Sequence, residues 1–111
     1  MNKQELAERW HAPKHVIDKM IKNGMIMYSL AKNGMNALTL IDISEEEVAR
    51  LEKELHIPAD VINSEEACEL LGCDYVKLYK YTRSGLNFTR LSYRIKLYSR
   101  KEVEEWQSQS H

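Results

Sequence analysis

The stretch EEACELLGCDYVKLYKYTRSG, residues 65–85, begins acidic, ends basic and carries three tyrosines in its second half. Apolar residues recur at helical spacing in both halves, at Ala67, Leu70, Leu71, Leu78 and Tyr81. Basic residues follow at intervals of three, at Lys77, Lys80 and Arg83. We therefore expect two short helices joined at Gly72, either as a packing unit or as a helix-turn-helix.

The same pattern occurs 61 residues earlier. Residues 2–24, NKQELAERWHAPKHVIDKMIKNG, align with residues 63–85 without a gap. The identical pairs are Asn2/Asn63, Glu5/Glu66, Glu8/Glu69, Lys19/Lys80 and Gly24/Gly85. Asn with Glu three residues on is typical of a helix N-cap with a capping box, and Gly after a basic turn is typical of a left-handed C-cap. The repeat predicts two copies of one helical pair.

A hairpin pattern follows each helical pair. Asn33-Gly34 lies between β-prone runs in residues 25–43, which is a strong hairpin signal. Residues 86–98 alternate in a similar way around a shorter turn.

A third helix follows each hairpin. Capping boxes are expected at Ser44 with Glu47 and at Ser99 with Glu102. At an offset of 55 residues, Val48 aligns with Val103 and Leu51 aligns with Trp106.

The order helix, turn, helix, hairpin, helix is that of a winged helix-turn-helix. The expected fold is α+β, with two tandem units (residues 1–57 and 58–111) related by a pseudo-two-fold axis as an internal dimer. Residues 56–62 are the expected linker, and the hairpins are candidates to join in a central antiparallel sheet. Core or helix-packing positions are predicted at Trp10, Met20, Met25, Met27 and Trp106.

Charge is segregated along the 111 residues, although the net charge is only −1. Residues 1–36 carry six Lys or Arg against three Asp or Glu, residues 37–72 two against ten, and residues 73–111 eight against four. Two basic ends around an acidic middle indicate two contact surfaces. The alternative interpretation is that these segments form solvated faces that differ in charge without binding a partner.

Cys68 and Cys73 align with Ala7 and Ala12, which predicts small core residues and neither a disulfide scaffold nor a zinc site. The four histidines are not paired with Cys or acid at a useful spacing, and no glycine-rich phosphate loop is present, so no enzyme activity is expected. No apolar run approaches the roughly 18 residues of a membrane span. We expect a soluble cytoplasmic protein with no membrane association and with no cofactor or metal.

The order of residues 66–86, a basic hairpin and then YSRKEVEEW (98–106) resembles the excisionase and MerR-type winged helix-turn-helix family. The matching positions are Glu66, Ala67, Leu71, Gly72, Leu78, Tyr79, Gly85, Leu86, Tyr98, Ser99 and Val103. In the first copy His11 stands where Gly72 does and Pro13 replaces Asp74, which leaves the tightness of that turn open. Two such units in one short chain resemble the TraN-type accessory proteins of Gram-positive conjugative plasmids. The family resemblance implies an excisionase or a small transcriptional regulator of a mobile element.

In a helix-turn-helix the second helix lies in the major groove and meets base edges and phosphates. In the second copy the expected exposed residues of this helix are Tyr75, Val76, Lys77, Tyr79, Lys80 and Arg83. The following hairpin is expected to contact phosphate or the minor groove through Thr89, Arg90, Tyr93, Arg94 and Lys96. A solvated face on a packing helix is the alternative interpretation.

The first copy predicts a weaker DNA surface. Its expected exposed residues are Lys14, His15, Asp18, Lys19 and Lys22, of which Asp18 would repel phosphate unless it accepts a hydrogen bond from a cytosine N4. Its hairpin offers only Lys32, so we expect that hairpin to serve in packing. The acidic run 44–55 should face away from DNA.

These patterns favour a sequence-specific double-stranded DNA-binding protein of a bacterial mobile element, acting as an accessory or regulatory factor of conjugative transfer. An excisionase (a recombination directionality factor) and a transcriptional repressor are alternatives with the same chemistry. A winged-helix protein-interaction module is the alternative from another class. Other proteins of a transfer or recombination complex are further candidate partners, and the expected working unit is a monomer.

Overall fold

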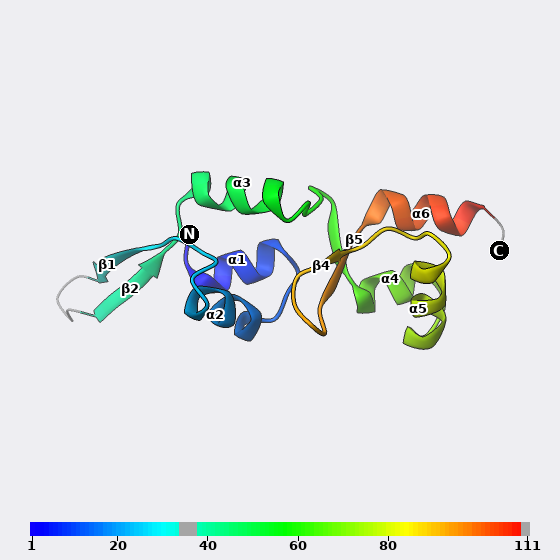
Figure 1. Cartoon of the computed structure of the whole chain (residues 1–111), viewed down its shortest axis with the longest axis horizontal. Coiled ribbons are helices and arrows are strands. Elements are labelled where there is room, and N and C mark those ends of the chain that lie inside the picture. Colours follow the sequence, from blue (N-terminus) through cyan, green and yellow to red (C-terminus); the bar gives the residue numbers. More distant parts are fainter. Residues whose placement is uncertain (34–37, 110–111) are drawn as a thin grey trace. The chain divides into compact units, whose positions relative to one another are not determined.

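The computed structural model describes residues 1–33 and 38–109 (Figure 1). Within these ranges it describes the backbone but not the side chains of residues 31–33 and 38–40. The fold is α+β, with six helices and small antiparallel sheets in the described part of the chain. The chain divides into two compact units, Met1–Glu54 (unit 1) and Leu55–His111 (unit 2). This division lies three residues before the boundary expected from the sequence.

The elements follow one another in the same order in both units. Unit 1 contains α1 (Lys3–Arg9), α2 (Lys14–Lys22), β1 (Ser29–Asn33), β2 (Leu38–Asp42) and α3 (Glu45–Glu54). Unit 2 contains β3 (Val61–Asn63), α4 (Ser64–Leu71), α5 (Tyr75–Arg83), β4 (Thr89–Arg90), β5 (Lys96–Ser99) and α6 (Arg100–Ser108). Each unit therefore has two helices, two strands and a third helix, and unit 2 has one more strand in front.

The first helix of each unit begins at a capped asparagine. The backbone N–H of Glu5 donates to Asn2 Oδ1 at 2.8 Å, and the backbone N–H of Asn2 donates to the Glu5 carboxylate at 3.1 Å. Glu66 and Asn63 form the same reciprocal pair, at 2.8 and 3.0 Å. The two capping boxes expected at Asn2 and Asn63 are confirmed.

The turn between the first two helices contains a left-handed residue in both units. Gly72 has φ +63° and His11 has φ +53°. The residue after each donates its N–H five residues back, to the carbonyl oxygens of Cys68 and Ala7, at 3.1 and 3.0 Å. The two turns are thus equally tight, although the left-handed conformation costs a residue with a Cβ atom about 1–2 kcal/mol.

Equivalent positions form the centre of each unit. The side chains of Leu6, Ile17 and Val48 in unit 1, and of Ala67, Leu78 and Val103 in unit 2, are all at most 2 % exposed. Trp10 is fully buried and donates its Nε1–H to the Glu52 carboxylate at 3.0 Å. Half-buried Trp106 packs against the core of unit 2.

The prediction that Met25 and Met27 are core residues is wrong. Their side chains are 43 % and 71 % exposed, whereas Ile26 between them is 2 % exposed. The N–H of Met25 bonds to the carbonyl of Met20 at 2.9 Å, which ends the α2 region, and the next residue turns inward. Met20 itself is buried, as expected.

The described strands form two separate sheets. β1 and β2 pair antiparallel, from Ser29 opposite Asp42 to Asn33 opposite Leu38, and β5 lies between β3 and β4 in the other sheet. The expected central sheet that joins the two hairpins is therefore wrong for these strands. The expected Asn33-Gly34 turn extends into residues 34–37, which lie outside the described residues.

β5 has β3 as its second neighbour, with Ile62 opposite Tyr98. β3 (Val61–Asn63) overlaps residues 56–62, which were expected to form the linker between the two units. Val61 and Ile62 are 7 % and 2 % exposed. Their burial explains why this β-branched pair forms a strand.

Met1 takes the corresponding place in unit 1. Its amino group donates to the Ile43 carbonyl at 2.6 Å, and the Ile43 N–H donates to the Met1 carbonyl at 2.7 Å. The two offsets that align the halves of the sequence place Met1 on Ile62 and Ile43 on Tyr98, which are partners in the β3–β5 pair. The structural equivalence thus extends beyond the aligned helices.

In each third helix, one of the two hydrogen bonds of the expected capping box is formed and the other is missing among the described residues. Ser44 Oγ accepts from the Glu47 N–H at 3.1 Å, and Ser99 Oγ accepts from the Glu102 N–H at 3.4 Å. Among the described residues, no bond returns from either glutamate to the serine backbone. The Glu47 carboxylate instead accepts from the Met27 N–H at 2.7 Å. It thereby ties α3 to the segment that enters β1.

Among the residues described, no helix combines the length and the apolar character needed to cross a membrane.

Candidate nucleic-acid interface

Helix α5 presents an exposed face along its whole length. Its N-cap is Asp74, whose carboxylate accepts from the Lys77 N–H at 2.8 Å. Leu78 is buried, and half-buried Tyr81 lies with its ring centroid 5.8 Å from that of Trp106. The remaining candidate side chains are exposed, as the sequence predicts: Tyr75, Val76, Lys77, Tyr79, Lys80 and Arg83.

The β4–β5 hairpin carries further candidate DNA-contacting residues. The N–H of Ile95 donates to the Ser92 carbonyl at 3.2 Å, which closes a tight turn with Tyr93 and Arg94 at its tip. Arg90 Nη1 donates to the Tyr93 carbonyl at 2.8 Å and spans the turn. The Tyr93 side chain is 83 % exposed.

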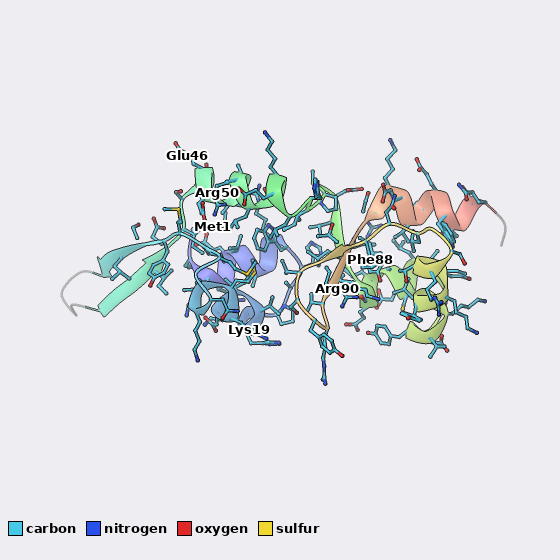
Figure 2. All side chains as sticks on the ribbon, viewed as in Figure 1. Met1, Lys19, Glu46, Arg50, Phe88 and Arg90 are labelled. Atoms are coloured by element: carbon cyan, nitrogen blue, oxygen red, sulfur yellow. The ribbon has the colours of Figure 1, made fainter. Side chains whose placement is uncertain are left out.

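Alternating cations and aromatic rings connect α5 to the hairpin. The Nζ atom of Lys96 lies 5.0 Å from the ring centroid of Tyr79 on α5 and 4.8 Å from that of Phe88, just before β4. The guanidinium carbons of Arg83 and Arg90 lie 6.0 Å from the Tyr79 and Phe88 centroids, respectively. Figure 2 shows Phe88 and Arg90 close together. We call these five residues the cation–aromatic row. All four contacts are within the range of cation–π attraction.

The positive charge of this surface is not compensated locally. Six basic side chains form no ion pair with a carboxylate among the described residues: Lys77, Lys80, Arg83, Arg90, Arg94 and Lys96. In unit 1, by contrast, Arg50 pairs with Glu47 and Glu54. An uncompensated basic surface attracts polyanions and raises their association rate.

The equivalent surface of unit 1 contains a carboxylate among its basic side chains. Its candidates are exposed as predicted: Lys14, His15, Lys19 and Lys22. Asp18 lies among them and its carboxylate pairs with Lys3 Nζ at 2.7 Å. The hydrogen bond from Lys3 lowers the pKa of Asp18, so the carboxylate remains ionised at neutral pH. Lys32, the basic residue expected on the first hairpin, has its side chain outside the described part of the structure.

The cysteines belong to the core of unit 2. Cys68 and Cys73 are free thiols, partly buried against the cluster that contains Leu78 and Val103. Burial raises the pKa of the Cys68 thiol to about 11, which keeps it protonated at neutral pH. Within the described residues, no group of three or more His, Cys, Asp or Glu side chains is placed to hold a metal ion.

Comparisons with protein families, with curated proteins and with solved structures found no match for this chain.

Phe88 is the residue of this surface that the sequence interpretation missed. Phe88 and Arg90 are two residues apart, and Arg90 pairs across the sheet with Lys96. Side chains two apart on a strand lie on one face, so an aromatic residue at this spacing could have been connected with the two cations. What could not be read from spacing is that Tyr79 of α5 lies on the other side of Lys96.

Proposed function

We propose that the protein binds double-stranded DNA in a sequence-specific manner through two tandem winged helix-turn-helix units. The uncompensated basic and aromatic surface of α5 and the β4–β5 hairpin carries this proposal. A helix of this kind fits the major groove, where Lys or Arg can pair with guanine O6 and N7. The hairpin cations would contact phosphates and so position the helix without reading sequence.

The biological role rests on resemblance. The excisionase and MerR-type pattern of unit 2, and the tandem arrangement similar to TraN-type proteins, support a cytoplasmic accessory or regulatory factor of conjugative transfer on a bacterial mobile element. An excisionase or a transcriptional repressor would use the same contacts on another DNA site. A footprint at a transfer origin, an attachment site or a promoter separates these three roles.

The DNA contact is tested with Lys80→Ala combined with Arg83→Ala. The matched control combines Lys53→Ala with Lys101→Ala, which removes the same charge from exposed positions on α3 and α6. Against a duplex selected from a random-sequence library, we expect the first variant to bind at least tenfold more weakly, because one good base contact contributes about 1–3 kcal/mol. Equal affinity of the two variants would refute the assignment.

One chain would supply both DNA-reading helices, α2 and α5. Covalent linkage makes the second contact intramolecular, so a weak reader in unit 1 still adds affinity. The two helices differ at the positions that would face bases (Lys14/Tyr75, His15/Val76, Asp18/Tyr79), so we expect two unlike half-sites within roughly 15–20 base pairs. Sedimentation of the protein with a minimal duplex should give one chain per site, and two chains per site would overturn the internal-dimer arrangement.

A further inference from the structure

Unit 1 exposes four apolar side chains in the run of residues 25–30 that enters β1, in which Ile26 is buried and Ser29 is polar. Met25, Met27, Tyr28 and Leu30 are 43 %, 71 %, 47 % and 63 % exposed. Single exposed apolar residues are ordinary on a protein surface, but contiguous ones mark sites of interaction.

A hollow of about 420 Å³ lies next to this run. Met27 and Tyr28 line one part of it, and Asp42, Glu46 and Arg50 line others. Glu47 also lines the hollow, and its carboxylate, only 8 % exposed, accepts from the Met27 N–H at 2.7 Å and from Arg50 Nε at 2.6 Å. These bonds fix the start of β1 against α3, so the hollow is preformed.

The rim of the hollow is acidic. The charge of Arg50 is compensated by Glu47 and Glu54, whereas Glu46 forms no ion pair among the described residues. Glu45 is exposed beside it. Figure 2 shows Glu46 and Arg50 on α3. The carboxylate of Asp42 is paired with the Met1 amino group at 3.2 Å, so Glu46 is the lining carboxylate without an ion pair among the described residues. Nucleic acid and anionic lipid would be repelled here, and a second copy would bring like charges together.

The β1–β2 sheet also has room for another strand. Neither strand has a second neighbour among the described strands, and an isolated two-stranded sheet is only marginally stable. An added extended segment could pair with an open edge, with side-chain specificity supplied by the adjacent hollow.

We propose that unit 1 binds an extended segment of another protein in which apolar side chains alternate with Lys or Arg. An apolar side chain fills the hollow beside Met27 and Tyr28, and a basic one faces Glu46. This surface is separate from the α5 surface and does not depend on the proposed DNA binding.

The test uses the full chain and a ten-residue peptide that alternates leucine or valine with lysine. A second peptide with glutamate in place of lysine is the control. In ¹⁵N–¹H spectra, we expect the lysine peptide to shift the backbone signals of residues 25–30 and 42–50. Binding should weaken at least tenfold in Met27→Ser combined with Leu30→Ser, and should not change in Ala59→Ser, which alters an exposed apolar residue of unit 2 outside the proposed DNA surface.

Glu46→Lys supplies a test that misfolding cannot imitate. It should weaken binding of the lysine peptide and strengthen binding of the glutamate peptide. The proposal is overturned if the two peptides bind equally to the unaltered chain, if the shifts fall on α5, or if neither peptide binds at millimolar concentration. Self-association in sedimentation equilibrium that Met27→Ser and Leu30→Ser abolish would also overturn it, in favour of a second copy as the occupant.

Discussion

Replacing Lys96 by glutamine should uncouple the hairpin of unit 2 from helix α5. Lys96 Nζ lies 5.0 Å from the Tyr79 ring centroid and 4.8 Å from that of Phe88, so one charge attracts two rings that come from different elements. A cation–π contact at an exposed site contributes about 0.5–1 kcal/mol. Two such contacts predict a decrease of about 1–2 kcal/mol in the free energy of unfolding of unit 2. For a domain of this size, each kcal/mol corresponds to about 4–8 °C in Tm.

The two tryptophans make this decrease measurable in the intact chain. Trp10 lies in unit 1 and Trp106 in unit 2, so their indole N–H signals in NMR spectra report the two units separately during urea unfolding. In Lys96→Gln the unfolding midpoint of the Trp106 signal should fall, while that of Trp10 stays constant. Lys96→Arg should retain most of the stability, because a guanidinium also attracts aromatic rings.

Arg94→Gln is the matched control for this prediction. Arg94 is exposed at the tip of the same hairpin and makes none of the ring contacts found among the described residues. The control variant removes the same charge and leaves every cation–π pair in place. Equal midpoints for Lys96→Gln and Arg94→Gln would show that the ring contacts do not stabilise unit 2.

Three further predictions concern the turn, the hairpin and the acid range. Gly72→Ala should destabilise unit 2 by about 1–2 kcal/mol in urea unfolding, because an added Cβ meets nothing within 4 Å and only the φ of +63° is penalised. An unchanged unfolding midpoint of unit 2 would show that this turn tolerates a side chain. Arg90→Ala combined with Arg94→Ala should reduce the slope of log affinity for DNA against log salt concentration by about two units, because each phosphate that is no longer neutralised contributes about 0.9. An unchanged slope would show that the hairpin does not contact DNA. The hydrogen bond from Arg50 lowers the pKa of Glu47 from 4.5, so the ionised Glu47 stabilises unit 1 above that pH, and this stabilisation is lost as the pH falls through the folded-state pKa. Glu47→Gln should therefore flatten the decline of unit 1 stability in acid, and an unaltered decline would show that other carboxyl groups cause it.

Features set by neighbours in the sequence were predictable. The capping boxes at Asn2 and Asn63 need only a glutamate three residues on, and both are formed. The buried positions Ile17 and Leu78 followed from helical periodicity and from the repeat. Exposure of the candidate basic residues of α2 and α5 followed from the same periodicity, because a helix position that does not face the core faces solvent.

Features that depend on distant segments were not predictable. β3 is a strand because β5 provides hydrogen-bond partners more than thirty residues away, and the short run Val61–Asn63 carries no period of its own. The place of Lys96 between two rings depends on how the hairpin lies against α5. The exposure of Met27 follows from the bond between its N–H and Glu47, twenty residues later in the chain. Composition predicted an apolar core residue at that position, but a long-range hydrogen bond decided its orientation.

The shared conformation of His11 and Gly72 has a consequence for how distant relatives of either unit can be recognised. The N-cap asparagine, the capping glutamate, the left-handed turn residue and the glycine of positive φ stand at 2, 5, 11 and 24 in one unit and at 63, 66, 72 and 85 in the other. The intervals are the same in both units, although the residue at the left-handed turn is not. A search by residue identity treats His11 as a mismatch, whereas a pattern that fixes the intervals and asks only for backbone conformation at the third position accepts both units. Diverged copies of this fold should therefore be easier to detect from the spacing of their caps and turns than from overall identity.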